Sequence, residues 1–327
     1  MTRIAVVGAG LAGLVVSREL SAISDVTVFE KSRGVGGRIA TRYAKDYEFD
    51  HGAQFFTARS RKFQSFLKPL IEQGVVSSWP ARFVELERNN IVATRQWDDD
   101  FPHYVGAPRM NAIGKYLAQG VDVRLQTTVA HIERTNKGWL VFDSEALELG
   151  LFDWVIFTAP SAQTAALSPE TSDIRKASES VRMAACCALM LAFEEPIDLP
   201  FDAALVRDAD ISWVSVNSSK PDRPNGMCFV VHSTNRWADA HFTDDSEALI
   251  SHLLAEFSNC TGIRNDKIRY CDVHRWRFAN IHRRDGPAYC IDDEFQLAAC
   301  GDWFVRGRIE AAYKSAISLS EALLDSI

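Results

Sequence analysis

The sequence lacks the features that mark membrane-spanning, fibrous, disordered and nucleic-acid-binding chains. Its 327 residues contain no internal repeat and no low-complexity stretch, and their composition is that of an ordinary globular protein. No apolar run reaches the roughly 20 residues that span a bilayer; the longest, at 183–193, is bounded by Arg182 and Glu194. Acidic residues outnumber basic ones by 43 to 36 and no basic cluster stands out, so we expect neither a nucleic acid nor a membrane as a partner.

Cysteine spacing of the kind that binds metal or exchanges disulfides is also missing. The seven cysteines are odd in number, no Cys-x-x-Cys occurs, and Cys186 and Cys187 are adjacent. Without a recognisable export signal, we expect free thiols in a cytoplasmic protein. We therefore assign no metal ligands.

The N-terminal segment carries the clearest motif. An apolar run at 4–7 is typical of a strand buried on both faces, and residues 8–13 read GAGLAG. A helical pattern then leads to a second apolar run at 26–29, which ends in Glu30. This order predicts a dinucleotide site, in which the helix N-terminus faces the pyrophosphate and the acid accepts hydrogen bonds from the adenosine ribose. The predicted contacts here are Gly8, Gly10, Leu11, Ala12, Gly13 and Glu30.

The next segment distinguishes FAD from NAD(P). Residues 33–42 read RGVGGRIATR and match the pattern R-x-x-G-G-R-x-x-T-R. Here the sequence resembles the FAD-dependent amine oxidase superfamily, in which this loop lies along the FAD pyrophosphate. The resemblance implies close backbone approach at two glycines and a charge-assisted phosphate contact from an arginine, and it disfavours an ordinary NAD-dependent dehydrogenase. It adds Lys31, Gly36, Gly37 and Arg38 to the predicted cofactor contacts.

Three later segments extend the resemblance. Residues 50–57 (DHGAQFFT) resemble a segment that passes the flavin ring, and residues 153–160 resemble the strand that returns to the FAD sheet. Residues 301–316 resemble the C-terminal Gly-Asp pair and the glycine-led helix whose N-terminus stabilises negative charge on the flavin. We interpret His51 as a structural hydrogen-bonding residue rather than an acid or base. The FAD contacts implied by these segments and by an adenine-contacting position are Ala53, Gln54, Phe55, Phe56, Val129, Ala159, Gly301, Asp302 and Ile309.

The predicted fold class is α/β: a Rossmann-type FAD-binding domain (GR2-like) with an inserted α+β substrate domain built on an antiparallel sheet. We place the discontinuous FAD-binding domain at 1–60, 106–165 and 285–327, and the substrate-binding domain at 61–105 and 166–284. Periodicity also predicts helices at 60–74, 108–119 and 247–257, and a capping box formed by Asp244 and Glu247.

One position near the C-terminus separates the subfamilies. Amine oxidases usually place an aromatic residue just after the C-terminal glycine, whereas this sequence has Arg308 after Gly307. A guanidinium repels an amine-derived cation and attracts phosphate or carboxylate. The strand at 274–279 also lacks the lysine that these enzymes often hold near flavin N5. Together with the WRFA segment at 276–279 and the Gly301-Asp302-Trp303 run, this makes the sequence most similar to bacterial renalases.

That resemblance implies an H₂O₂-forming oxidase. Renalases oxidise the 2-dihydro and 6-dihydro isomers of NAD(P)H to NAD(P)+ by hydride transfer to flavin N5, and dioxygen is reduced to hydrogen peroxide. Such a donor needs no proton removal, so we assign no side-chain base. We expect non-covalent FAD, although the cysteines and histidines leave covalent attachment open. The candidate contacts for the dihydronicotinamide nucleotide are Arg308, Thr57, Arg59, Arg95 and His241.

Two alternatives stay open. The chain could be a flavin-containing amine oxidase or another oxidase of the superfamily, or a non-catalytic flavoprotein. The sequence does not distinguish NAD from NADP as substrate, and it does not predict the oligomeric state.

Overall fold

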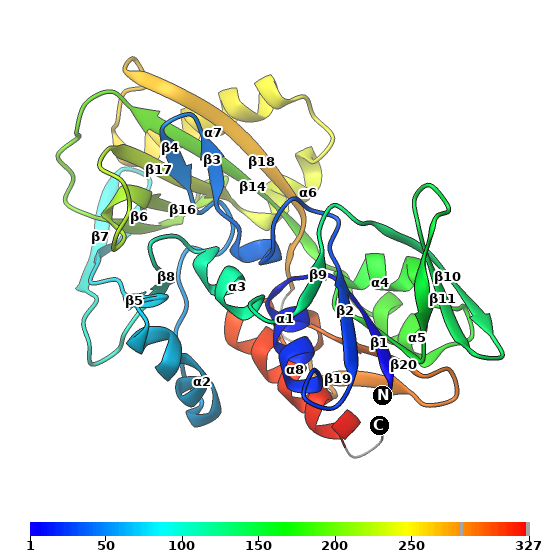
Figure 1. Cartoon of the computed structure of the whole chain (residues 1–327). Helices are drawn as coiled ribbons and strands as arrows, with labels where there is room; N and C mark the ends of the chain where they lie inside the picture. Colours follow the sequence, from blue (N-terminus) through cyan, green and yellow to red (C-terminus); the bar gives the residue numbers. More distant parts are fainter. Residues whose placement is uncertain (282–283, 325–327) are drawn as a thin grey trace. The chain divides into compact units, whose positions relative to one another are not determined.

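The chain folds into two compact units (Figure 1). The computed structural model describes residues 1–281 and 284–324. The first unit comprises Met1–Ile39, Ile113–Met183 and Asn280–Ile327, and the second comprises Ala40–Ala112 and Ala184–Ala279. The predicted boundaries between the two domains follow residues 60, 105, 165 and 284, whereas the boundaries between the two units follow residues 39, 112, 183 and 279. The ends of two predicted ranges, 282–283 and 325–327, lie outside the described residues.

The first unit is built on a six-stranded sheet in the order β19-β20-β13-β1-β2-β9. Five strands run parallel, and β19 pairs antiparallel with β20 at one edge. The central strands are buried on both faces, which explains their continuous apolar sequences. The strands are β1 (Arg3–Val7), β2 (Asp25–Phe29), β9 (Asp122–Arg124), β13 (Trp154–Phe157), β19 (Tyr289–Asp292) and β20 (Leu297–Cys300).

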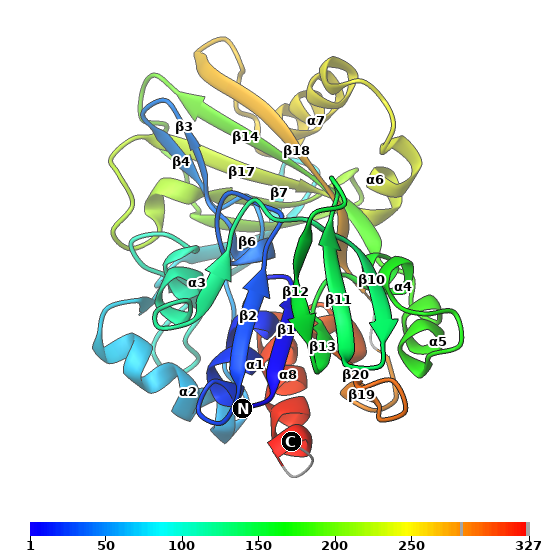
Figure 2. The same cartoon turned by 45° about the vertical axis from the view of Figure 1, so that its right-hand side comes forward.

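Two long helices and a three-stranded meander cover this sheet (Figure 2). Helix α1 (Leu11–Leu20) packs along α8 (Ile309–Leu324), while β12 of the meander packs on β1. The remaining elements are β10 (Val129–Thr135), β11 (Gly138–Asp143), β12 (Glu148–Phe152), α3 (Ala112–Leu117), α4 (Ser161–Leu167), α5 (Asp173–Glu179), η1 (Gly37–Ile39) and η3 (Asp302–Phe304).

The second unit is built on a seven-stranded sheet in the order β18-β14-β17-β16-β15-β6-β7. The pairs from β14 to β15 are antiparallel, as is the β6–β7 hairpin, but β15 pairs parallel with β6. The sheet that was predicted to be antiparallel is therefore mixed, with a parallel pair between β15 and β6. Its strands are β6 (Arg82–Glu87), β7 (Asn90–Gln96), β14 (Ala184–Phe193), β15 (Ala203–Arg207), β16 (Ile211–Val216), β17 (Met227–Ser233) and β18 (Ile268–Asn280).

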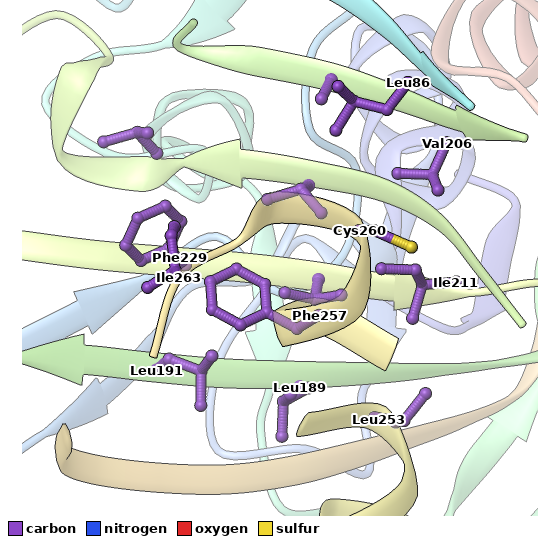
Figure 3. Close-up of a cluster of buried hydrophobic side chains, with 14 of the residues drawn as sticks. Leu86, Leu189, Leu191, Val206, Ile211, Phe229, Leu253, Phe257, Cys260 and Ile263 are labelled. Carbon is purple, nitrogen blue, oxygen red and sulfur yellow. The ribbon is translucent and has the colours of Figure 1, made fainter. Parts of the chain in front are cut away.

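The core of the second unit lies between this sheet and α7 (Ser246–Thr261) (Figure 3). The helix buries Leu249, Leu253, Phe257 and Cys260, whose spacing of three and four residues places them on one face. The hairpin of β3 and β4 covers the other side of the sheet, where Phe49 packs with Met190 and Val230. The smaller elements are β3 (Arg42–Ala44), β4 (Tyr47–Phe49), β5 (Val76–Ser78), β8 (Tyr104–Gly106), α2 (Arg61–Glu72), α6 (Asn235–His241) and η2 (Asn217–Ser219).

Two local predictions were wrong. The helix predicted at 108–119 begins only at Ala112, because Met110 N–H donates to Asp50 (3.0 Å) and holds the preceding residues in a turn. The predicted capping box at Asp244 does not form. Asp245 is the N-cap of α7, and its side chain accepts a hydrogen bond from Ala248 N–H at 2.8 Å. None of the helices in the described part of the chain combines the length and the apolar composition needed to cross a bilayer.

A buried ion cluster anchors residues 50–57 in the second unit. Asp50 is fully enclosed and lies 2.5 Å from Arg223 and 3.6 Å from Lys220. Burial alone would raise the pKa of Asp50, but the two cations outweigh it and hold the pKa below its usual value. Burial lowers the pKa of Lys220 to about 8, with Asp50 opposing part of the shift. Lys220 also donates to Gln54 (3.2 Å) and Asn217 (3.1 Å), so this buried charge is fully paired.

We predict that the stability difference between the wild type and Lys220→Met depends on pH. Above pH 8 the folded protein loses the Lys220 proton, while the unfolded chain keeps it up to its ordinary pKa of 10.5. Because the unfolded state then binds more protons, the wild type gains stability relative to the variant as the pH rises from 8 to 10. Urea unfolding of both proteins at pH 7, 8, 9 and 10 measures this gain. The exposed Lys267→Met variant is the control and shows no such gain, because Glu195 raises the pKa of Lys267; a difference independent of pH for Lys220→Met would contradict the prediction.

Candidate cofactor and substrate sites

The turn between β1 and α1 is shaped by three glycines with different roles. Gly8 has a φ of +108°, a conformation that favours glycine. A Cβ on Gly13 would lie 2.0 Å from the Gly8 carbonyl oxygen and 2.7 Å from Thr158 Oγ1, so α1 reaches the sheet only because residue 13 has no side chain. A Cβ on Gly10 would meet nothing within 4 Å. The turn is therefore closed behind Gly8 and Gly13 and open at Gly10, where a ligand can approach the backbone.

Glu30 follows β2 and holds this turn from the side. Its Oε2 accepts a hydrogen bond from Ala9 N–H and its Oε1 accepts one from Ser32 N–H, both at 2.8 Å. Each carboxylate oxygen keeps a further lone pair that a ribose hydroxyl can use. Gly36 N–H donates to the Ala9 carbonyl at 2.8 Å, which ties the 33–38 loop to the glycine turn. The sequence-predicted residues at 8–13 and 30–38 thus form one continuous surface in the first unit.

The C-terminal Gly-Asp pair joins the same surface. Arg38 donates two hydrogen bonds to the carboxylate of Asp302, at 2.9 and 2.5 Å. Beside this pair, the Trp303 indole donates to the carbonyl of Ala159 at 3.1 Å, and Gly301 N–H donates to Ser315 at 2.8 Å. The phosphate contact of Arg38 and the flavin contact of Asp302 stay predictions, since in this structure the two side chains bind each other.

The start of α8 lies next to this loop in sequence. Arg308 precedes the helix and is exposed. Ala311 N–H already donates to the Arg308 carbonyl at 3.1 Å, so the N–H of Ile309, the predicted flavin contact, precedes the first internal hydrogen bond of the helix. Val129, the predicted adenine contact, opens β10 and is buried.

The donor and acceptor set of the first unit fits the dinucleotide part of FAD. Helix α1 begins at Leu11, and its N-cap Gly10 supplies no side-chain cap, so the first N–H groups of the helix stay available for phosphate oxygens. The open face of Gly10 leaves room for a pyrophosphate. The carboxylate of Glu30 is fixed where it can accept ribose hydroxyls, and Arg38 lies on the same surface as a predicted phosphate donor. The residues that would hold FAD are therefore already arranged around one open turn.

The predicted flavin-facing segment at 50–57 lies in the second unit. The side chain of Gln54 is fully used: Oε1 accepts from Ser215 (2.7 Å) and Lys220, and Nε2 donates to the carbonyls of Asp50 and Gly52. This residue can reach a ligand only through its backbone. Phe55 packs against Trp97 and Trp213, while Ala53 and Phe56 complete the predicted segment.

His51 lies within an aromatic and imidazole cluster. Its ring stacks on Trp276 with centroids 5.0 Å apart, and His274 meets it edge-on at 4.7 Å. Its carbonyl accepts hydrogen bonds from the Trp276 indole (2.9 Å) and from His232 Nε2 (3.2 Å). Arg42 lies 3.3 Å from His274 Nδ1. These contacts tie β3, β17 and β18 to the segment that begins at Asp50.

The three imidazoles of this cluster are neutral at physiological pH. Burial lowers the pKa of His51 to about 3, with His274 and Arg42 adding to the shift. Burial and Arg42 lower the pKa of His274 to about 4. Burial also lowers the pKa of His232 to about 4, and the charge of Lys220 contributes. The cluster therefore offers weakly basic hydrogen-bonding groups beside one permanent cation.

The candidate substrate residues in the second unit are spread over it. Thr57 and Arg59 lie in the segment between β4 and α2. Arg95, on the edge strand β7, is 69% exposed and pairs with Glu85 at 3.7 Å. His241, on α6, pairs with Asp244 at 2.8 Å and stacks on Trp237. Helix α6 packs on β14, and β14 lies five strand spacings, or about 24 Å, from β7 in the sheet. One small ligand therefore does not reach both Arg95 on β7 and His241 on α6.

Sequence reasoning missed the inward-facing cations of the second unit. Lys220 and Arg223 lie in a segment that reads SSKPDRPNG, whose composition is typical of an exposed loop. The available signal was Asp50, an acid directly after a strand in a segment expected at a cofactor, because a buried carboxylate needs a cationic partner. His232 and Arg42 gave no separate signal.

We predict that alanine substitutions at two glycines of the turn impair different properties, FAD binding at Gly10 and stability at Gly13. Gly10→Ala leaves the stability of the FAD-free protein within about 1 kcal/mol of wild type, but weakens FAD binding at least about tenfold, because its Cβ stands where the pyrophosphate approaches. Gly13→Ala destabilises the FAD-free protein by more than about 2 kcal/mol, because its Cβ overlaps the Gly8 backbone. Urea unfolding and FAD titration separate the two effects. Equal FAD affinity of wild type and Gly10→Ala would show that the pyrophosphate does not approach there.

Comparisons with known proteins identify the family. The family model described as flavin containing amine oxidoreductase matches residues 66–324, and a model of an NAD(P)-binding Rossmann-like domain matches residues 6–70. A protein assigned as a protoporphyrinogen oxidase from Exiguobacterium sp. 255-15 superposes with a TM-score of 0.78 at 12% identity, with 98% of each chain covered. A triple mutant of putrescine oxidase superposes with a TM-score of 0.76 at 12% identity, covering 100% of this chain and 99% of that one. These two likenesses concern the fold; the family match shows that the chain belongs to the flavin-containing amine oxidoreductases and is an FAD-dependent oxidoreductase of that superfamily.

Proposed function

We propose that the protein is an oxidase of the renalase type, which converts 2-dihydro and 6-dihydro isomers of NAD(P)H to NAD(P)+ and forms hydrogen peroxide. Bound FAD, which we propose is held without a covalent link, supplies a two-electron acceptor that dioxygen reoxidises. The observation that carries the proposal is the cluster around His51, which combines neutral imidazoles, an indole face and the Arg42 guanidinium.

This cluster suits a planar, uncharged ring better than an amine. An amine substrate arrives as an ammonium and must lose a proton, whereas imidazoles with pKa values of about 3 and 4 are poor bases at neutral pH. The nearby guanidinium of Arg42 also repels a cation. A dihydropyridine ring has no proton to lose before it gives up a hydride, so stacking and orientation suffice.

The chain's own residues then have defined tasks. The glycine turn and Glu30 hold the dinucleotide part of the cofactor, and the ion cluster at Asp50 keeps the 50–57 segment in one conformation. Arg308, Thr57 and Arg59 are our proposed contacts for the phosphates or ribose of the substrate. Arg95, which pairs with Glu85, and His241, which pairs with Asp244, are further candidates, of which one small ligand reaches at most one. No general base is required by this scheme.

A second candidate, an amine oxidase, is favoured by the family model and by the fold likeness to putrescine oxidase. We predict that anaerobic mixing decides between them. The isomers made by borohydride reduction of NAD(P)+ bleach the flavin rapidly, while benzylamine and authentic 4-dihydro NADH do not, because benzylamine arrives as a cation that the Arg42 guanidinium repels and 4-dihydro NADH carries its hydride on a different ring carbon. Stopped-flow absorbance measures the bleaching. Bleaching by benzylamine but not by the isomers would support the amine oxidase, and bleaching by none of them would support a non-catalytic flavoprotein.

We also predict that Arg308→Ala weakens substrate capture by about tenfold while FAD content stays unchanged. The exposed guanidinium precedes α8, where a cation suits phosphate better than it suits an amine. The dependence of the flavin reduction rate on isomer concentration reports capture, and absorbance reports FAD content. Arg308→Lys keeps the positive charge and therefore retains part of the substrate capture that Arg308→Ala loses. An unchanged concentration dependence in Arg308→Ala would remove this residue from the substrate site.

A further inference from the structure

A pocket of about 390 Å³ lies within the first unit, where the first two turns of α8 form part of its wall. Its volume falls within the range of small-molecule sites, which begins at roughly 300 Å³. Three cations line it, Arg284, Arg306 and Lys314, together with two acids, Asp285 and Glu310. None of these lining residues is a predicted contact of FAD or of the dihydronicotinamide substrate. The pocket is therefore a candidate site of its own, with more positive than negative charge.

Two of the three cations have no acid to neutralise them. Lys314 Nζ lies 3.0 Å from Glu310, whose side chain is 8% exposed. Within residues 1–281 and 284–324, by contrast, the side chains of Arg284 and Arg306 form no ion pair. Nη1 of Arg284 is enclosed without a hydrogen-bond partner, and such a donor costs free energy in a native protein. Like charges on the wall of one pocket also repel each other, so an anion in the pocket would remove both costs.

The guanidinium of Arg284 is held in place although it has no acidic partner. Its central carbon lies 5.3 Å from the centroid of the Phe304 ring, and the backbone N–H of Arg284 donates to the carbonyl of Val305 at 3.0 Å. Phe304 is itself buried and stacks on Trp303, with centroids 3.9 Å apart. A guanidinium that is fixed before a ligand arrives loses less entropy on binding. Arg284 is therefore arranged like a binding residue rather than like a solvated side chain.

The placement of the cations favours a phosphate group over a carboxylate. Arg284 precedes β19, Arg306 follows η3 and Lys314 lies on α8, so donors come from three different segments. A phosphate presents acceptor oxygens in several directions, whereas a carboxylate has two oxygens in one plane. The acids Asp285 and Glu310 disfavour a ligand that carries many negative charges, and their oxygens can accept hydrogen bonds from hydroxyl groups. Phosphate and hydroxyl groups together are the chemistry of a sugar phosphate.

We propose that this pocket binds the phosphate group of a small hydroxylated molecule, such as a sugar phosphate, through Arg284, Arg306 and Lys314. The proposal goes beyond the proposed function and does not depend on it, because no residue of the pocket takes part in that scheme. The ligand binds the folded protein and not the unfolded chain, so it also raises the thermal stability of the FAD-loaded enzyme.

The test measures binding to the FAD-loaded protein by isothermal titration calorimetry at constant ionic strength. In this form FAD fills the glycine turn, so an added phosphate does not report on that turn. The probes are ribose 5-phosphate, inorganic phosphate, ribose and citrate. Arg284→Gln and Arg306→Gln each remove one guanidinium but keep a polar side chain, and Arg306→Lys keeps the charge. Arg236→Gln is the matched control, because Arg236 is an exposed arginine on α6 in the second unit.

We expect the wild type to bind ribose 5-phosphate more tightly than inorganic phosphate, and not to bind ribose. Arg306→Gln and Arg284→Gln each weaken the binding of ribose 5-phosphate at least about tenfold, the change that one hydrogen bond to a charged group makes. Arg306→Lys retains part of the affinity, because a lysine keeps the charge but not the planar pair of donors. Arg236→Gln binds like the wild type. Ribose 5-phosphate also raises the Tm of the wild type by more than that of Arg306→Gln.

Four results would count against the proposal. If the wild type binds neither phosphate probe, the pocket is not a phosphate site. If both glutamine variants keep the wild-type affinity, the phosphate binds elsewhere. A loss of binding in Arg308→Ala alone would move the phosphate to the proposed substrate site, and citrate that binds as tightly as ribose 5-phosphate would replace phosphate by carboxylate as the ligand. Should Arg284→Gln not fold, Arg306→Gln and Arg306→Lys decide the outcome, because the Arg306 side chain has no ion pair to lose in the described part of the chain.

Discussion

The close approach of α1 to the end of β1 is the constraint on which the cofactor surface depends. Residue 13 must be a glycine because its position leaves no space for a Cβ in front of the Gly8 carbonyl. Thr158, at the end of β13, donates to the carbonyls of Val7 and Gly8 at 3.0 and 2.8 Å and so completes the same junction. Once these backbones meet, the open side of Gly10 and the carboxylate of Glu30 are set at the positions where a pyrophosphate and a ribose can bind.

The second unit solves a different problem, because it must hold a polar segment rigid in a buried place. Asp50 does this by accepting from Arg223, Thr41 and Met110 N–H, each from a different part of the unit. Such a cluster contributes little net stability when complete, but removing one member leaves an uncompensated charge. Its value lies in fixing one conformation of the segment that follows, including the side chain of Gln54 and the backbone of His51.

Much of the first unit was predictable from the sequence, because its motifs are local. Buried parallel strands read as apolar runs, and the glycine spacing and Glu30 have mechanical reasons that hold in any such turn. The pairing of Arg38 with Asp302 joins positions 264 residues apart, and only a resemblance, not spacing, suggested that they share a site. In the second unit, Lys220 and Arg223 were not predictable, since their neighbours read as an exposed loop and their burial depends on a carboxylate far away in sequence. The parallel pairing of β6 with β15 was likewise not predictable, because it depends on tertiary structure and no local sequence pattern indicates it.

The order in which the strands occur along the chain has a consequence for synthesis. In the first unit, β13 pairs with β1 on one side and with β20 on the other, and β20 is made only after the whole second unit. During translation the edge of the apolar strand β13 (Trp154–Phe157) that will pair with β20 therefore stays unpaired for a time on the order of ten seconds, at ordinary rates of elongation. The nascent polypeptide thus exposes an apolar strand with one unpaired edge to the ribosome surface and to chaperones until β20 has emerged. The second unit, by contrast, has all of its own strands by residue 280.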